Sequence, residues 1–396
     1  MRRGVRARDD DDRSPMAAYE SRDQVAVAAA LITELARRPL TPDALAGARA
    51  VLAGRVPDAA LDPAAERAML DAVDPLWARG WTPRDLVEVV RRRIGATTAP
   101  LAAELVATDA VRRPATWRTG VETVPGDVPL LTSWRARTGV DGLGAVLRLV
   151  GTMLSLPPLP AAPAVEPDTS GIDPKVLARV RGLLAKAEST TFAEEAEALS
   201  AKAQELMARH ALAAATVTGA AEAVPTAGVR RLWLDLPYTS AKSSLCHQVA
   251  GANRCRAVSL DALDLVTVVG HPTDLDTVEL LTTSLLVQAG RAMAGAGSGS
   301  RTRSFRHAFL LSYATRIGER LRAAGEAAEA AARAESGDAL LPVLAARGEV
   351  VERTVAELFP RLTTKRFSVG NAAGWRAGRE AADAASLRVG REALHE

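Results

Sequence analysis

Apolar residues in the first part of the chain recur at the spacing of helices. From Asp23 to about Leu156 they fall every three or four positions, so successive helices would each turn one apolar face toward a core. The first 20 residues are charged and lack this period. We therefore predict a disordered tail over residues 1–20 and a helical domain over residues 21–155.

One turn within this domain has the outline of a helix-turn-helix. A predicted helix ending at Arg79 is followed by Gly80, which suits the position after a helix end, and Thr82 is placed to cap the next helix. That helix ends in the basic cluster Arg91–Arg93. A DNA-reading helix-turn-helix and an ordinary pair of packed helices share this outline, and the ordinary pair is the commoner of the two.

The middle of the chain is predicted to hold a linker and a helical hairpin. Residues 156–171 are rich in proline and alanine, as linkers often are. Over residues 172–220, a helix opened by Asp173 and a second opened by the capping pair Thr191 and Glu194 each carry one apolar stripe. Two such helices joined by a short polar turn fold back antiparallel on each other.

The predicted hairpin carries four short motifs in a fixed order. They are a basic first helix from Lys175, a Glu-Ser-Thr turn at Glu188, a Glu-Glu-Ala opening at Glu194 and a closing Lys-Ala-Gln-Glu-Leu-Met at Lys202. With these motifs the segment resembles the domain of unknown function 2786 family. The segments Leu76–Leu86 and Val269–Asp276 are similar, more loosely, to flanking regions of actinobacterial members. The resemblance implies an architecture, and it implies no reaction and no catalytic residues.

Beyond residue 228 apolar residues alternate with other residues at a period of two, which is typical of strands, instead of recurring at the spacing of helices. Three strands are predicted, over residues 231–236, 255–260 and 263–270. A helix from Ala241 to Ala250 separates the first two strands, and a helix capped by Thr273 with Asp276 follows the third. The order β-α-β-β-α predicts a small sheet with helices on one face, which is an α+β unit.

Long helices complete the predicted architecture. One runs from Arg303 to about Arg333, and a last helical region starts at Asp338, with a break near Pro360–Gly370. The predicted fold class is therefore mostly α and multi-domain. It comprises an N-terminal helical domain, a central antiparallel helical hairpin, and a C-terminal α+β unit over residues 228–396 with a small sheet and long helices.

Composition excludes disordered, membrane-spanning and disulfide-framework proteins, while the net charge excludes none. Hydrophobic residues make up 48% of the chain and charged residues 24%, which is typical of globular proteins, and the net charge is only +3. No apolar run is long enough to span a bilayer. Two cysteines, Cys246 and Cys255, cannot build a disulfide framework and fit a reducing compartment. We expect a cytoplasmic protein that makes no contact with a membrane.

The most chemically suggestive segment lies between the third predicted strand and the helix after it. His271 is predicted at the strand end, and Asp274 and Asp276 fall in the first turn of the helix, a place where α/β sites gather. These three residues are the candidates for a metal-dependent hydrolase. The competing and commoner interpretation is structural, because Thr273 and Asp276 have capping-box spacing and the helix dipole favours Asp274.

Other metal and cofactor motifs do not fit. Cys246, His247, Cys255 and His271 lack the paired spacing of structural zinc ligands. The Gly- and Ser-rich loop from Gly295 lacks the preceding strand and the Lys-Ser/Thr pair of a P-loop. We therefore predict no metal site and no cofactor.

Basic helical surfaces supply the leading functional hypothesis, which is a non-enzymatic protein that binds nucleic acid or a protein partner. The candidate contact residues are Arg91, Arg92, Arg93, Lys175, Arg179, Arg301, Arg303 and Arg306. The alternative is the hydrolase with its site at His271, Asp274 and Asp276. A scaffold that binds only proteins is a third possibility.

Overall fold

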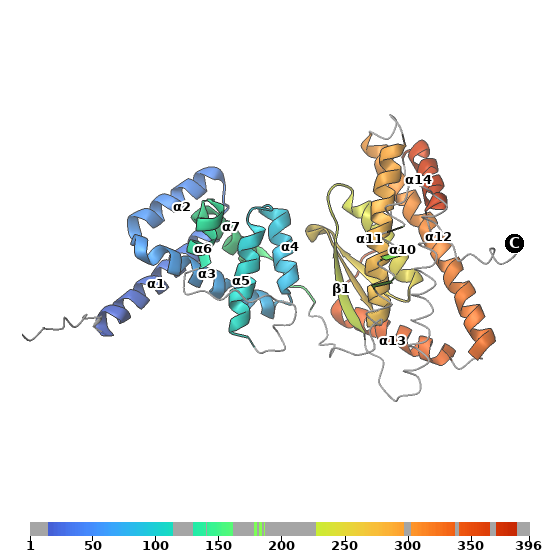
Figure 1. The fold of residues 1–396 in the computed structure, drawn as a ribbon, viewed down its shortest axis with the longest axis horizontal. Coiled ribbons are helices and arrows are strands. Elements are labelled where there is room, and N and C mark those ends of the chain that lie inside the picture. Colours follow the sequence, from blue (N-terminus) through green and yellow to red (C-terminus); the bar gives the residue numbers. More distant parts are fainter. Residues whose placement is uncertain are drawn as a thin grey trace, which may run out of the picture. The chain divides into compact units, whose positions relative to one another are not determined.

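The computed structural model describes residues 15–113, 130–139, 141–160, 227–296, 302–336, 340–364 and 370–385, together with residues 178, 179, 182, 183 and 186. The chain divides into two units, residues 1–161 and 162–396, which are considered one at a time (Figure 1). Most of the segment that resembles the domain of unknown function 2786 family lies outside the described residues, including the predicted hairpin turn and second helix. Residues 1–14 and 161–177 lie outside them as well.

The first unit is helical, as predicted. Its elements are α1 (Pro15–Ala36), α2 (Pro42–Arg55), α3 (Asp58–Ala78), α4 (Pro83–Arg93), α5 (Ala99–Val111), α6 (Leu130–Thr138) and α7 (Gly142–Ser155). Helix α1 begins within the predicted disordered tail, so any such tail is shorter than expected. Helix α3 packs against α1, α5, α6 and α7, and its buried face is largely alanine, which lets these helices approach closely.

The turn between α3 and α4 has the predicted chemistry. Gly80 adopts a φ of 82°, a left-handed conformation that glycine reaches without a steric penalty. Thr82 and Asp85 form a reciprocal capping box at the start of α4. Helix α4 buries Leu86, Val89 and Val90, and it packs mainly against α5 rather than lying along α3.

A three-stranded antiparallel sheet lies in the second unit, in the predicted order of elements. It is built by β1 (Gly228–Trp233), α10 (Thr239–Ala252), β2 (Arg256–Leu260), the short 3-10 turn η2 (Asp261–Leu263), β3 (Leu265–Gly270) and α11 (Pro272–Gly295). The strand order is β1-β3-β2, with Leu232 opposite Val266 and Ser259 opposite the same residue on the other side. All six residues of β3 are buried, as expected of a central strand.

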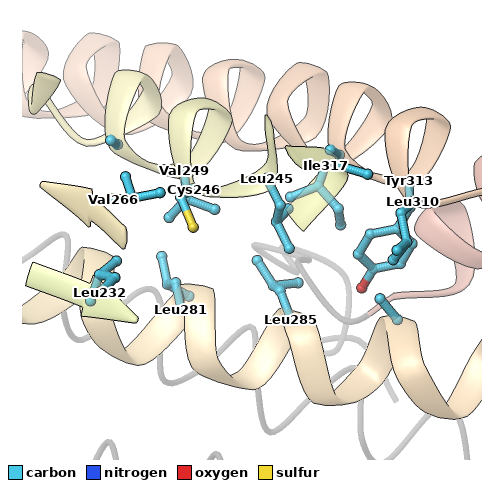
Figure 2. Packing of buried hydrophobic residues seen from close by; sticks show 14 of the residues in the cluster. Leu232, Leu245, Cys246, Val249, Val266, Leu281, Leu285, Leu310, Tyr313 and Ile317 are labelled. Carbon is cyan, nitrogen blue, oxygen red and sulfur yellow. The ribbon is translucent and has the colours of Figure 1, made fainter. Parts of the chain in front are cut away.

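Helices cover both faces of this sheet, which corrects the prediction of one covered face. Val266 and Val268 of β3 turn toward a core shared with α10, α11 and α12 (Arg303–Ser336). Figure 2 shows Leu281 and Leu285 of α11 facing the side chains of α10 and α12 in that core. On the opposite face, Val269 packs with residues of α13 (Leu340–Leu358).

The C-terminal helix α14 (Ala372–Ala384) lies along α12 (Figure 1). Gly374 abuts the backbone of Phe305, and Gly378 abuts the backbone of Phe309. Because both contacts advance four residues in the same direction, the two helices run parallel. Glycine at these two positions permits the close approach, since a Cβ would overlap a carbonyl oxygen of α12. Within the described residues, no helix is long and apolar enough to cross a membrane.

Candidate functional site

The segment from His271 to Asp276 is organised differently from the predicted capping box. Helix α11 begins at Pro272, with His271 rather than Thr273 as its N-cap residue, and Thr273 is completely buried. The His271 carbonyl accepts a hydrogen bond from the Leu275 amide at 2.9 Å. The predicted Thr273–Asp276 cap is therefore wrong, because the proline at position 272 already occupies the first helical position.

The two carboxylates of this segment face different arginines. Asp274 is 3% exposed and accepts a 2.9 Å hydrogen bond from Arg254, which follows α10. Asp276 accepts a 2.6 Å hydrogen bond from Arg230 of β1, which also binds Glu279 at 2.6 Å. Each carboxylate thus joins α11 to another element of the unit. The described residues contain no group of three or more His, Cys, Asp or Glu side chains that could hold a metal ion.

Both cysteines are buried free thiols within the core of the second unit. Burial raises the pKa of Cys246 to about 12. Burial, and after it the negative charge of Asp274, raises the pKa of Cys255 well above its ordinary value. Neither thiol is therefore suited to act as a nucleophile near neutral pH.

His247 of α10 follows Cys246 in the chain, but its hydrogen-bond partner lies on β2. Its Nε2 is 2.9 Å from Oγ of Ser259 on β2. Loss of solvation and then the charge of Arg256 lower the pKa of His247, while Asp261 acts in the opposite direction. The ring is thus neutral near pH 7 and ties α10 to an edge strand.

The predicted basic cluster lies at the C-terminal end of α4. Arg91 and Arg93 are exposed, Arg92 is half-buried, and Arg84 is exposed at the opposite end of the same helix. Arg84 and Arg91 are seven residues apart, so they project from nearly the same side of α4 about 10 Å apart along its axis. Helix α4 therefore presents an arginine-rich face, which we define as Arg84, Arg91 and Arg92. Arg93, nine residues after Arg84, projects from the opposite side of the helix.

One carboxylate lies within this face. Glu88 accepts a 2.7 Å hydrogen bond from Nη2 of Arg91 and a 2.6 Å hydrogen bond from Nε of Arg92. The hydrogen bond from Arg91 is the main cause that lowers the pKa of Glu88; burial opposes it, and Arg92 adds to it. Glu88 is thus ionised at neutral pH and is shared between two guanidinium groups.

The arginines of α12 divide into two groups. Arg303 is exposed and Arg306 half-buried in its first turn, which Thr302 caps by accepting a hydrogen bond from the Phe305 amide. Farther along, Arg316 pairs with Glu319 and Asp383, and Arg320 donates to the carbonyls of Ala382 and Ala385. These later arginines hold α14 against α12. Of the remaining candidates, Arg179 is exposed, and Lys175 and Arg301 lie outside the described residues.

Sequence reasoning did not identify the roles of two residues beside the α3–α4 turn. The guanidinium of Arg79 donates to the carbonyls of Met153 and Leu156 at the end of α7, both at 2.7 Å. Trp81 donates its indole N–H to Pro157 at 2.8 Å. These bonds join the turn to a segment more than 70 residues away, and no local pattern indicates such a pairing.

Comparisons with known proteins identify one family similarity. A family model described as "Protein of unknown function (DUF2786)" matches residues 175–214, which confirms the similarity predicted from the hairpin motifs. The match covers a short part of the chain. No curated protein and no solved structure matches the chain. The similarity therefore assigns neither a reaction nor a ligand.

Proposed function

We propose that this protein is a non-enzymatic binding protein that contacts nucleic acid through the arginine-rich face of α4. The observation that carries the proposal is the exposure of Arg84 and Arg91 on the same side of one short helix, with the half-buried Arg92 beside Arg91. Helix α4 contains four arginines against Asp85 and Glu88. Asp85 is buried in the capping box, so the exposed part of the helix is mainly cationic.

Phosphate groups match this surface chemically. Guanidinium groups bind phosphate oxygens through two parallel N–H donors, and neutralising backbone phosphates releases condensed counterions. Arginine contacts to phosphate oxygens position a protein on nucleic acid without reading its base sequence. We therefore propose binding that depends strongly on salt and weakly on base sequence.

The hydrolase alternative has less support from the contacts of its residues. Asp274 and Asp276 are held by Arg254 and Arg230, so a metal ion would have to displace an arginine from each carboxylate. We also propose a cytoplasmic location, because two buried free cysteines suit a reducing compartment. A protein partner with an acidic surface is the alternative ligand for the same face of α4.

A salt titration of binding to a fluorescent DNA duplex of mixed sequence tests the proposal. The test variant replaces Arg84, Arg91 and Arg92 with glutamine. A matched control replaces Arg37, Arg38 and Arg55, three exposed arginines of the same unit, with glutamine. Both variants lose the same charge, so a difference between them reports the position of the arginines and not the net charge.

The proposal expects binding at low ionic strength that weakens linearly on a log–log plot against salt. Loss of one to three phosphate contacts in the α4 variant would reduce the slope by roughly 0.9–2.7, whereas the control would keep most of the slope. Absence of binding by the natural chain at the lowest salt would overturn the proposal. An equal loss in both variants would overturn the role of α4.

A further inference from the structure

Glu88 occupies the position between two arginines where a phosphate would bind. Nε and Nη2 of Arg91 donate to its two carboxylate oxygens at 3.0 and 2.7 Å, and Nε of Arg92 donates at 2.6 Å. The Glu88 side chain is 22% exposed and that of Arg91 47% exposed. The site is thus partly shielded from solvent, which strengthens its ion pairs, yet it opens to the surface through Arg91.

Carboxylates and phosphates compete for the same geometry. The planar fork of a guanidinium group donates to two oxygens of either group, and both anions gain from charge-assisted hydrogen bonds. Because Arg91 and Arg92 lower the pKa of Glu88, the carboxylate stays charged at neutral pH and keeps its hold on both arginines. A phosphate that approaches this end of α4 must therefore displace Glu88.

We propose that Arg91 and Arg92 form a binding site for a phosphodiester group and that Glu88 is its intramolecular competitor. This inference rests on the proposed function, since it names the ligand group and the regulation of the same face of α4. Glu88 makes binding weaker and less dependent on salt than it would be if every arginine of this face contacted a phosphate. Nucleic acid engages both guanidiniums fully only when the Glu88 side chain turns away.

The competing explanation is that Glu88 only stabilises the helix. Pairs of opposite charge three and four residues apart do so in many helices. A purely helical role predicts that replacing Glu88 changes the stability of α4 and leaves binding unaltered, apart from the effect of net charge. The experiment must therefore separate competition for the arginines from a change in net charge.

Two substitutions of Glu88 make that separation. Glu88→Gln removes the charge, and Glu34→Gln is the matched control, because Glu34 is an exposed residue of α1 in the same unit. Glu88→Asp keeps the net charge but shortens the side chain, so one carboxylate no longer reaches both guanidinium groups. Each full-length variant is titrated with the same DNA duplex over a range of salt, and circular dichroism verifies its helix content.

Competition predicts that Glu88→Gln binds more tightly than the natural chain and has a steeper salt dependence. Two additional phosphate contacts would increase the slope of log affinity against log salt by roughly 1.8. Glu88→Asp should shift in the same direction by a smaller amount, while Glu34→Gln keeps the natural slope. Adding Arg91→Gln and Arg92→Gln to Glu88→Gln should abolish the gain.

Three outcomes would overturn the inference. Glu88→Gln with the slope of Glu34→Gln would show that only net charge matters. If Glu88→Asp keeps the affinity and slope of the natural chain, shortening the carboxylate side chain does not free the arginines, and Glu88 is not a competitor. If neither the natural chain nor Glu88→Gln binds at the lowest salt, the proposed function and the inference fail together; binding by the natural chain with an unchanged Glu88→Gln slope removes the inference alone.

Discussion

The indole N–H of Trp77 donates a 2.9 Å hydrogen bond to Oδ2 of Asp109, which links α3 to α5. Asp109 is completely buried, and it also binds Arg112 and Arg113, which directly follow the end of α5. A buried carboxylate is stable only when its oxygens are paired in this way. The pair Trp77–Asp109 therefore joins the α3 core to the α4–α5 pair that presents the arginine-rich face.

Replacing Asp109 with alanine should destabilise the first unit by about 3 kcal/mol, because it removes the acceptor of the 2.9 Å bond from Trp77 and the buried carboxylate that pairs with Arg112 and Arg113. Asp71→Ala is the control. Asp71 pairs with Arg67 on the surface of α3, with a side chain 54% exposed, and its loss should cost about 0.5 kcal/mol or less. Urea unfolding followed by tryptophan fluorescence measures both, and equal midpoints would contradict the role of Asp109.

The same carboxylate should make the first unit sensitive to acid. Burial acts to raise the pKa of Asp109, but hydrogen bonds from Arg113, Trp77 and Arg112 lower it below its ordinary value. A lowered pKa in the folded state gives stability that is present above the unfolded pKa of about 4 and is lost as pH falls through the folded pKa. Stability measured from pH 6 downward should therefore decline less steeply in Asp109→Asn than in the natural chain.

Close packing of α14 on α12 should not tolerate a side chain at Gly378. A Cβ there would overlap the carbonyl of Phe309, so Gly378→Ala should destabilise the helix pair by about 2 kcal/mol. Gly348→Ala in α13 is the control, because a Cβ meets nothing within 4 Å there, and it should stabilise by about 0.5–1 kcal/mol. Hydrogen exchange of α14 amides in Gly378→Ala and of α13 amides in Gly348→Ala measures the two changes. Faster exchange in the first and slower exchange in the second is the expected result, and unchanged α14 exchange would contradict the close packing.

Local sequence patterns predict the helices and strands of this protein better than they predict which of them pack against one another. The order β-α-β-β-α and the capping of α4 by Thr82 depend on neighbouring residues, and both predictions are confirmed. Coverage of the second sheet face depends on Val351 and Val355 of α13 meeting Val269, more than 80 residues earlier. No period in the sequence relates these positions, so the sheet was expected to be covered on one face.

The candidate sites show the same difference between residues that local patterns predict and contacts between distant elements. The arginines of α4 were visible as a cluster, but the sharing of Glu88 by two of them became apparent only from side-chain geometry. At the start of α11, the spacing of Asp274 and Asp276 fits either a site or a cap. The arginines that hold these carboxylates come from β1 and the turn after α10, and an ion pair between distant elements leaves no mark on the sequence.

Leu183 should anchor the segment that matches the family model to the second unit. Its side chain packs against the core formed by α10, α11 and α12. Leu183→Ala should therefore cost about 1–2 kcal/mol, less than a fully buried leucine because the residue is only partly covered. Leu362→Ala is the control, since Leu362 is 51% exposed and should change stability by about 0.5 kcal/mol at most. Faster hydrogen exchange in α10 and α12 with Leu183→Ala alone would support this anchoring, and equal exchange would contradict it.

The buried thiols should make the second unit sensitive to alkali. Burial raises the pKa of Cys246 to about 12, whereas an unfolded cysteine has a pKa of about 8.5. A thiol pKa that is raised in the folded state gives stability that is fully present below the unfolded pKa and is lost as pH rises above it. Stability should thus fall between pH 8.5 and 11, and Cys246→Ala, although less stable at pH 7, should show a smaller fall. As a second measurement, the folded chain at pH 8 should react with a thiol reagent far more slowly than the chain in urea, because burial keeps both thiols protonated and covered. Equal rates in the folded and unfolded chain would contradict the buried state of both cysteines.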